Sequence, residues 1–301
     1  MSSLDTRGGV WKRLNRVLEL VEQWLGLLLP SHPNPAFFDQ HLAFRWETRA
    51  GGGALVPIPA PALFDLDELM GIEPGLVQLE QNTQQLLAGL PFNDILLHGE
   101  RGTGKSSAVR GLLQRYGEQG LRVVEVDRND VADLPRVLDA VRSGSNQAFL
   151  VFCDDLTFSS GDPGFSEIKA SLQGGLTARP PRTAIVATSN RRHLVPESMS
   201  DNRGARVDEE GELHLGEALE EKLALADRFG LVIGFYAFDQ PTYLRAIDDF
   251  LLRSGLPIMD EALKREALRF SLQRGSRSGR TARQFADSAI GRIRLSRAGV
   301  S

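Results

Sequence analysis

The stretch GERGTGKS, residues 99–106, matches the pattern G-x-x-x-x-G-K-[ST] at every fixed position. An apolar run, Ile95–His98, comes before it, and a helix-forming segment, Ser106–Tyr116, follows it. Its glycines allow the backbone to curl until successive N–H groups point at phosphate oxygens. The start of the following helix adds the positive end of its dipole. This strand–loop–helix unit predicts a phosphate-binding loop.

The pattern assigns roles to the polar side chains of the loop. We expect Lys105 to reach the β- and γ-phosphates of a nucleotide and the Ser106 hydroxyl to coordinate Mg²⁺. ATP and Mg²⁺ are the implied ligands. The predicted nucleotide contacts from this region are Gly99, Glu100, Arg101, Gly102, Thr103, Gly104, Lys105, Ser106 and Ser107.

Two further strand candidates end in polar side chains. The run Phe149–Cys153 is followed by Asp154 and Asp155, and Ala184–Ser189 is followed by Asn190. Buried carboxylates are unfavourable unless they are paired or bind a metal. Asp154 is therefore a candidate Mg²⁺ ligand and Asp155 a candidate base for the attacking water. Asn190 is a candidate for orienting that water or contacting the γ-phosphate. The alternatives are two surface acids and a turn-forming or helix-capping asparagine.

Strand-type and helix-type segments alternate through the middle of the chain. The strand candidates are Ile95–His98, Leu121–Val126, Ala148–Cys153, Ala184–Thr188 and Leu231–Phe238, and the helix candidates are Ser106–Tyr116, Leu134–Arg142, Phe165–Leu172 and Glu217–Asp227. The alternation predicts an α/β fold with a five-stranded parallel sheet covered on both faces. Three helical segments follow from Gln240 and end near Arg297. We expect three parts, at residues 1–62, 63–239 and 240–301.

The first of these parts differs from the rest. Val10–Leu28 has apolar residues at helical spacing with charges between them, which indicates an amphipathic helix and argues against a membrane span or a signal peptide. Residues 31–62 are rich in proline and glycine and are typical of a linker with one short strand near His41–Glu47. The single cysteine, Cys153, cannot form an internal disulfide, so a cytoplasmic location is the simplest interpretation. Its place within an apolar strand favours packing over reactivity.

Charge is unevenly distributed along the chain. The whole chain has 35 basic and 39 acidic side chains, a net charge of −4. Residues 264–301 contain ten basic and two acidic side chains, which gives +8 and leaves −12 on the remainder. This asymmetry is compatible with a nucleic-acid site, but it favours a solvated helical face plus one or two arginines directed at a bound phosphate.

Taken in order, the phosphate loop, the carboxylates, the polar strand end and the helical tail resemble those of AAA+ ATPases. The sequence is similar in particular to a bacterial AAA+ family catalogued as a domain of unknown function. The matching stretches are GERGTGKSS from Gly99, FCDDL from Phe152, ATSNRRHL from Ala187, DRFGL from Asp227 and SGRTARQF from Ser278. The resemblance extends from about Leu63 to the end of the chain.

The resemblance implies further roles. Asn190 corresponds to the sensor-1 residue, and Arg228 to the arginine finger that reaches the γ-phosphate of a neighbouring subunit. Arg283 corresponds to the sensor-2 arginine of a C-terminal helical lid, with Arg280 as the competing candidate. The segment Asp67–Ile72 resembles the one that backs the adenine, which makes Ile72 a candidate contact. Each arginine also has a plain surface role as its alternative.

One position departs from the family pattern, because most AAA+ ATPases have glutamate where this chain has Asp155. Aspartate is one methylene shorter, and misplacement of about 1 Å can lower a rate about 100-fold. We therefore expect an ATPase, with either slow or rapid turnover, that assembles into a homo-oligomeric ring and remodels or loads a macromolecular partner. The alternatives are a slow or non-hydrolysing nucleotide switch or adaptor, and a DNA-directed loader.

Overall fold

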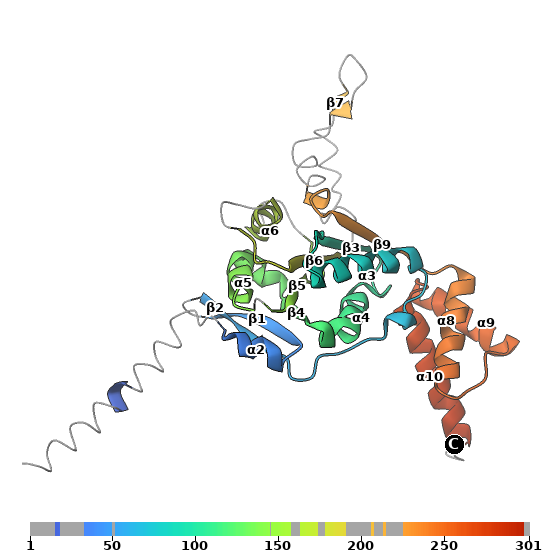
Figure 1. The fold of residues 1–301 in the computed structure, drawn as a ribbon. Helices are drawn as coiled ribbons and strands as arrows, with labels where there is room; N and C mark the ends of the chain where they lie inside the picture. The colour runs from blue at the N-terminus through green and yellow to red at the C-terminus, as the bar shows by residue number, and fades with distance from the viewer. Residues whose placement is uncertain are drawn as a thin grey trace, which may run out of the picture.

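The computed structural model describes residues 16–18, 33–49, 52–144, 146–157, 163–173, 178–190, 206–207, 213–214 and 225–297. Figure 1 shows the elements along the chain. In order, they are α2 (Pro35–Gln40), β1 (Ala43–Arg49), β2 (Gly52–Pro57), η1 (Leu66–Glu68), α3 (Glu73–Leu87), β3 (Ile95–Gly99), α4 (Lys105–Tyr116), η2 (Gly117–Gln119), β4 (Leu121–Val126), η3 (Arg128–Asp133), α5 (Leu134–Val141), β5 (Ala148–Cys153), α6 (Pro163–Gln173), β6 (Thr183–Ser189), β7 (Arg206–Val207), β8 (Leu213–His214), β9 (Leu231–Phe235), α8 (Gln240–Arg253), α9 (Glu261–Arg274) and α10 (Gly279–Arg297).

The main sheet has seven strands in the order β2-β1-β4-β5-β6-β3-β9. The five strands that the sequence predicts are neighbours in this order, and all their pairings are parallel. The predicted number of five strands is nevertheless wrong. Strand β1 adds to β4 in parallel, and β2 pairs with β1 antiparallel, which extends the sheet by two strands.

The two additional strands come from the region expected to be a linker. Phe38 of α2 packs edge-on against Phe44 of β1 and Phe149 of β5, with ring centroids 5.3 and 5.0 Å apart. Glycine is needed opposite the Trp46 ring, because a Cβ at Gly53 would lie 2.2 Å from that ring. The glycines and prolines that indicate a linker are thus part of a hairpin that belongs to the sheet.

Alternating side chains place two hydrophobic clusters on opposite faces of the sheet. In β5, Phe149, Val151 and Cys153 face the cluster that includes α2, α5 and α6. Leu150 and Phe152 face the cluster that includes α3 and α4. This period of two is the one expected for a strand covered on both faces. Cys153 is fully buried, and burial raises the pKa of its thiol to about 12, which agrees with a packing role.

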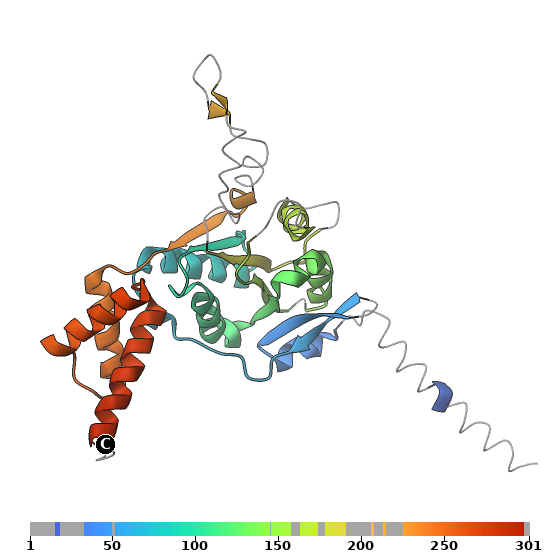
Figure 2. The same cartoon turned by 180° about the vertical axis from the view of Figure 1, so that it is seen from behind.

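The last three helices form a third cluster. Tyr243 and Ile247 of α8, Ala267 of α9 and Phe285 of α10 are all buried in it. These helices gather at one end of the molecule, opposite the β1–β2 hairpin (Figures 1 and 2). The predicted C-terminal group of three helices is therefore confirmed, and α10 ends at Arg297 as expected.

Other expectations concern helices and membrane association. Within Val10–Leu28 the structure describes residues 16–18, which are helical, and the rest of that expected helix lies outside the described residues. Of the expected helix Glu217–Asp227, the residues before 225 also lie outside the described residues. Helix α3 was missed by the sequence analysis, although Pro74 stands in its first turn. Across the described ranges, no helix combines the length and apolarity that membrane crossing requires.

The hairpin's contribution to stability can be measured through Phe44. Its side chain is fully buried against Phe38 and Phe37, so Phe44→Ala should lower the free energy of unfolding by about 3–5 kcal/mol. Chemical denaturation followed by circular dichroism measures this change. The control Arg45→Ala removes only an exposed ion pair with Glu125 and should change stability by less than about 1 kcal/mol. If both substitutions changed the free energy of unfolding by the same small amount, the hairpin would not contribute to the stability of the sheet.

Candidate functional site

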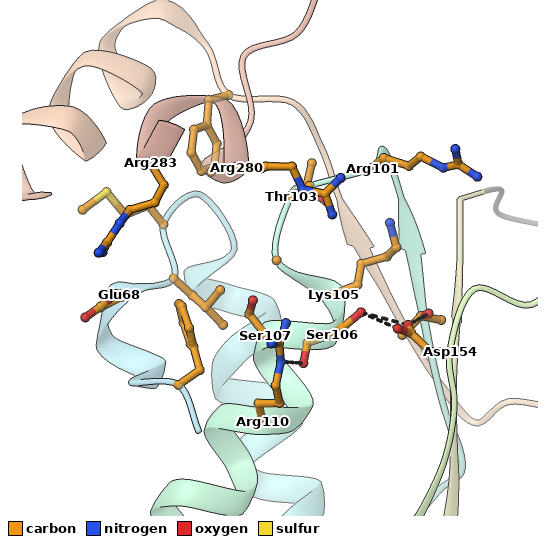
Figure 3. A pocket seen from close by; sticks show the side chains of 18 of the residues that line it. Glu68, Arg101, Thr103, Lys105, Ser106, Ser107, Arg110, Asp154, Arg280 and Arg283 are labelled. Carbon is orange, nitrogen blue, oxygen red and sulfur yellow. Dashed lines mark hydrogen bonds between the residues drawn. The ribbon is translucent and has the colours of Figure 1, made fainter. Parts of the chain in front are cut away.

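A pocket of about 730 Å³ opens at the carboxyl ends of β3, β5 and β6, against the C-terminal helices (Figure 3). The loop between β3 and α4 forms one wall, the ends of β5 and β6 form the second, and α10 forms the third. The lining residues from these walls are Arg101, Gly102, Thr103, Gly104, Lys105, Ser106, Ser107, Arg110, Asp154, Asp155, Thr188, Asn190, Gly279, Arg280 and Arg283. The structure thus brings together three groups of candidates that are far apart in sequence.

The loop has the backbone that the glycine pattern predicts. Gly102 and Gly104 have φ angles of 79° and 112°, in the region that favours glycine. A Cβ at Gly104 would lie 2.7 Å from the Leu69 side chain, and one at Gly102 would lie 2.9 Å from Arg280. Helix α4 begins at Lys105, so the N–H groups of its first turn, which lack acceptors within the helix, lie at the pocket.

Lys105 is held inside the loop. Its ammonium donates to the carbonyls of Gly99 and Glu100 at 2.7 and 2.8 Å and to Asn190 Oδ1 at 3.2 Å. Gly99 and Glu100 do not line the pocket themselves, but they position the lysine through these carbonyls. Burial lowers the pKa of Lys105, and the carboxylates of Asp155 and Asp154 oppose that shift. The Thr103 hydroxyl donates to the Glu100 carbonyl at 2.8 Å and ties the loop together.

Ser106 and Asp154 form a pair of oxygen ligands. The Ser106 hydroxyl lies 2.8 and 3.1 Å from the two carboxylate oxygens of Asp154, as Figure 3 shows. Magnesium prefers carboxylate and other hard oxygen ligands and commonly takes only one or two carboxylates from the protein. The donor set present here fits that ion.

Asp155 occupies an unusual backbone conformation. Its φ is 51°, which is uncommon outside glycine, asparagine and aspartate. The Asn190 amide donates to one carboxylate oxygen at 2.5 Å, and the Arg101 guanidinium lies 3.6 Å from the other. The Asp155 carboxylate is thus in contact with both Asn190 and Arg101.

Sequence reasoning missed Thr188. This residue lies two positions before Asn190 in β6 and is buried beside both aspartates. Its hydroxyl donates to Asp154 Oδ1 at 2.5 Å and accepts from the Asp155 N–H at 2.8 Å. The signal that could have revealed it is a polar residue within an otherwise apolar strand, close to a candidate site residue.

Part of the pocket lining is apolar, but it does not include Ile72. That side chain is buried in the cluster beneath α3 and α4, and it does not line the pocket. Neighbouring members of the predicted segment, Leu69 and Met70, line the pocket instead. Phe64, Phe238 and Phe250 complete the apolar lining, and Glu68 adds a carboxylate to the pocket.

In Figure 3, Arg283 lies on the side of the pocket where Glu68 lies, whereas Arg280 lies beside Thr103 of the phosphate loop. The backbone N–H of Arg280 donates to the Gly102 carbonyl at 3.0 Å, and the charge of the Arg280 guanidinium helps to lower the pKa of Lys105. Arg283 donates to Asp287 at 3.0 Å and lies over the Phe250 ring, 5.0 Å from its centroid. Arg280 is therefore the residue beside the phosphate loop.

Arg228 lies outside this pocket. It follows the helical residues 225–226, precedes β9 and is half-buried, and its N–H donates to the Leu225 carbonyl at 3.2 Å. The residues that line the described pocket do not include it. A role for Arg228 in nucleotide chemistry would have to be exerted on another copy of the chain.

Residues 39–293 match the family described as "Protein of unknown function (DUF815)". The chain belongs to the DUF815 family. The match includes the whole seven-stranded sheet and nearly all of α10, so it covers every wall of the pocket. No curated protein matches the sequence.

Two solved structures of Thermotoga maritima RuvB resemble the DUF815 chain in fold. The proline-to-glycine mutant has a TM-score of 0.50 and 16% identity over 78% of this chain and 67% of that chain. The alanine-to-serine mutant has a TM-score of 0.51 and 15% identity over 78% of this chain and 66% of that chain. The DUF815 chain thus spans about two thirds of each RuvB chain and has the α/β fold of an AAA+ P-loop NTPase.

The positions of Arg280 and Arg283 predict different effects on nucleotide affinity. Arg280→Ala should weaken the binding of a fluorescent ATP analogue roughly 10- to 100-fold, because a charge-assisted contact beside the phosphate loop is lost. Arg283→Ala should change affinity less than about threefold, because its guanidinium is engaged by an exposed aspartate. The reverse ranking in the titration would identify Arg283 as the phosphate-facing arginine.

Proposed function

We propose that this DUF815 protein binds ATP with Mg²⁺ and hydrolyses it as an oligomer that remodels or loads a macromolecular partner. The observation that carries the proposal is the convergence in one pocket of Lys105, Ser106, Asp154, Asp155 and Asn190. They come from three sequence segments and occupy the carboxyl ends of adjacent parallel strands, where α/β sheets bind ligands.

The mixed lining of the pocket supports a nucleotide rather than a free phosphate. The phosphate loop, Lys105 and Arg280 line it together with Leu69, Met70 and three phenylalanines, and Leu69 lies against Gly104 of the loop. A purine ring is buried best against apolar and aromatic side chains, while charged donors orient the phosphates. The pocket lining supplies both kinds of contact.

In the proposed reaction, each side chain has a defined part. Lys105 would leave the loop carbonyls and donate to the phosphates, and Ser106 and Asp154 would hold Mg²⁺. The metal, when bound, would neutralise charge on the phosphate oxygens. Asp155 would accept a proton from the attacking water, which Asn190 would orient. Arg228 of a neighbouring copy would stabilise the charge on the transferring phosphoryl group.

One observation favours a switch as the second candidate function. In the structure Asp155 already accepts from Asn190 and lies near the Arg101 guanidinium, and both contacts oppose proton abstraction by its carboxylate. If these contacts persist with nucleotide bound, the protein would hold ATP and release phosphate slowly. Single-turnover phosphate release separates this switch from a steadily cycling ATPase.

A DNA-directed loader is less well supported. Within the basic tail, Lys264 pairs with Glu261, and Arg292 pairs with Glu266. Arg280 and Arg283 line the nucleotide pocket. These contacts favour the interpretation of the tail as a solvated helical face that also supplies arginines to the pocket.

The domain organisation and location also enter the proposal. We infer that residues 240–301 act as a lid over the nucleotide, as the pocket contacts of α10 suggest. The nucleotide domain would begin near Pro35 rather than at residue 63, since α2, β1 and β2 pack into it. A cytoplasmic location is retained as part of the proposal because the single cysteine is a buried thiol.

Lys105→Ala should abolish measurable binding of an ATP analogue while the protein stays folded, because phosphate contacts at a loop are lost. Isothermal titration with ATP and Mg²⁺ gives the affinity, and circular dichroism checks the fold. Lys264→Ala on α9 is the matched control, and its affinity should be unchanged. Unaltered affinity in folded Lys105→Ala protein would refute the phosphate-loop assignment.

Asp155→Asn should bind ATP within about threefold of the wild type but lose most turnover, because only the base is removed. Phosphate release under saturating ATP measures the rate, and the same titration gives the affinity. Asp154→Asn serves as the comparison, and its loss should appear in Mg²⁺-dependent binding as well. If Asp155→Asn kept full turnover, the water would have to be activated by another group.

Arg228→Ala should bind ATP normally and lose turnover by on the order of 10³-fold or more if it acts in trans. Mixing it with Lys105→Ala protein should restore part of the activity, since mixed oligomers contain some complete sites. Activity per subunit should also rise with protein concentration. Concentration-independent activity of the wild type, with no recovery on mixing, would show that Arg228 has no role between subunits.

A further inference from the structure

Thr188 is the one buried hydroxyl in the described pocket lining that contacts both aspartates. It occupies the penultimate position of β6, and its side chain is 1% exposed. The hydroxyl donates to Asp154 Oδ1 at 2.5 Å and accepts from the Asp155 N–H at 2.8 Å. A hydroxyl has one proton to donate, so this single proton is committed to Asp154.

The Thr188 backbone adds a second attachment. Its carbonyl accepts from the Leu156 N–H at 2.8 Å, and the next side chain, Ser189, donates to the Leu156 carbonyl at 2.9 Å. The turn that follows β5 is therefore fastened to the end of β6 at three consecutive residues, 154 to 156. Two of those residues carry the proposed metal-binding and base roles.

The fastening determines the direction of the Asp155 side chain. Its left-handed backbone, with φ of 51°, is a conformation that aspartate tolerates better than most residues. The bond from its N–H to Thr188 stabilises this conformation. The carboxylate then lies beside Asn190 and Arg101, so the backbone rather than side-chain length sets its position.

The same hydroxyl orients Asp154. Oδ1 accepts from both Ser106 and Thr188, whereas Oδ2 accepts from Ser106 at the longer distance of 3.1 Å. A carboxylate held at one oxygen presents its other oxygen in a fixed direction, as second-sphere hydrogen bonds do at metal sites. Loss of the hydroxyl would free Asp154 to rotate.

We propose that Thr188 is a positioning residue that sets Asp154 for Mg²⁺ and Asp155 for the attacking water through one hydroxyl. The inference rests on the proposed ATPase function and adds a residue to it. Thr188 acts on the reaction through the two aspartates, and this role does not require contact between Thr188 and the nucleotide. It also gives a structural reason why aspartate serves where most AAA+ ATPases carry glutamate.

The test compares Thr188→Val, which keeps the shape and removes the hydroxyl, with Thr188→Ser, which keeps the hydroxyl. Thr183→Val is the matched control, because it removes another buried hydroxyl at the opposite end of β6. Fluorescent ATP analogue binding is titrated against Mg²⁺, and binding without Mg²⁺ is measured separately. Phosphate release then gives kcat and KM.

Thr188→Val should require about tenfold more Mg²⁺ for half-maximal binding and should lose about tenfold or more in kcat, because Asp154 keeps only Ser106 as a hydroxyl partner and can reorient. Its binding without Mg²⁺ and its KM at saturating Mg²⁺ should stay within about threefold. Thr188→Ser should restore most of both losses, and Thr183→Val should resemble the wild type. If Thr188→Val fails to fold, Thr188→Ala replaces it with the same expectations.

If the folded variant without the Thr188 hydroxyl had the Mg²⁺ dependence and kcat of the wild type, the inference would be overturned and the ATPase proposal would stay intact. Equal losses in Thr183→Val and Thr188→Val would also overturn it, since the effect would then be one of general stability. Failure of the wild type to bind the analogue at any Mg²⁺ concentration would refute the proposed function, and the role of Thr188 with it.

Discussion

The position of β6 between β5 and β3 is the constraint on which the site depends. Parallel strands deliver their carboxyl ends to one edge, so the phosphate loop after β3 and the aspartates after β5 lie on either side of β6. The end of β6 must therefore connect them. Thr188 reaches the aspartates on one side, and Asn190 contacts Lys105 on the other. Replacing this strand's polar end with apolar residues would leave the Ser106–Asp154 and Arg101–Asp155 contacts to connect the loop region and the acids within the described residues.

The connected side chains satisfy one another before any nucleotide is present. Lys105 uses carbonyls of its own loop and Asn190, and Asp155 uses Asn190 and Arg101. Burying unpaired charges is unfavourable, so this pairing holds the charged groups in place within a folded pocket. Binding of a triphosphate is consequently an exchange of contacts rather than the filling of a pocket of free donors. The net affinity is the difference between two sets of charge-assisted bonds.

The sequence predicted what local patterns determine and missed what depends on distant contacts. The phosphate loop and five parallel strands follow from short motifs and apolar runs, and they were found correctly. Strand β1 was placed only approximately and β2 was missed, because β1 pairs with β4, about 80 residues away, and β2 contains glycines that fit the Trp46 ring. Ile72 was assigned to the pocket although its side chain points into the core. The choice between Arg280 and Arg283 depends on where α10 starts relative to the loop, which spacing alone does not fix.

Contacts between the pocket wall and the C-terminal helices join the segment that precedes α3 to the phosphate loop. Met70, on the segment that precedes α3, packs against the third hydrophobic cluster, which α8, α9 and α10 form. It also lines the pocket. Arg253 of α8 bonds Glu68 on that segment at 3.1 Å and Asp249 on its own helix at 2.7 Å. The C-terminal helices are thus attached to the segment that precedes α3 and, through Arg280, to the phosphate loop. Because α8 and α10 belong to the same hydrophobic cluster, these two sides of the pocket are linked through it.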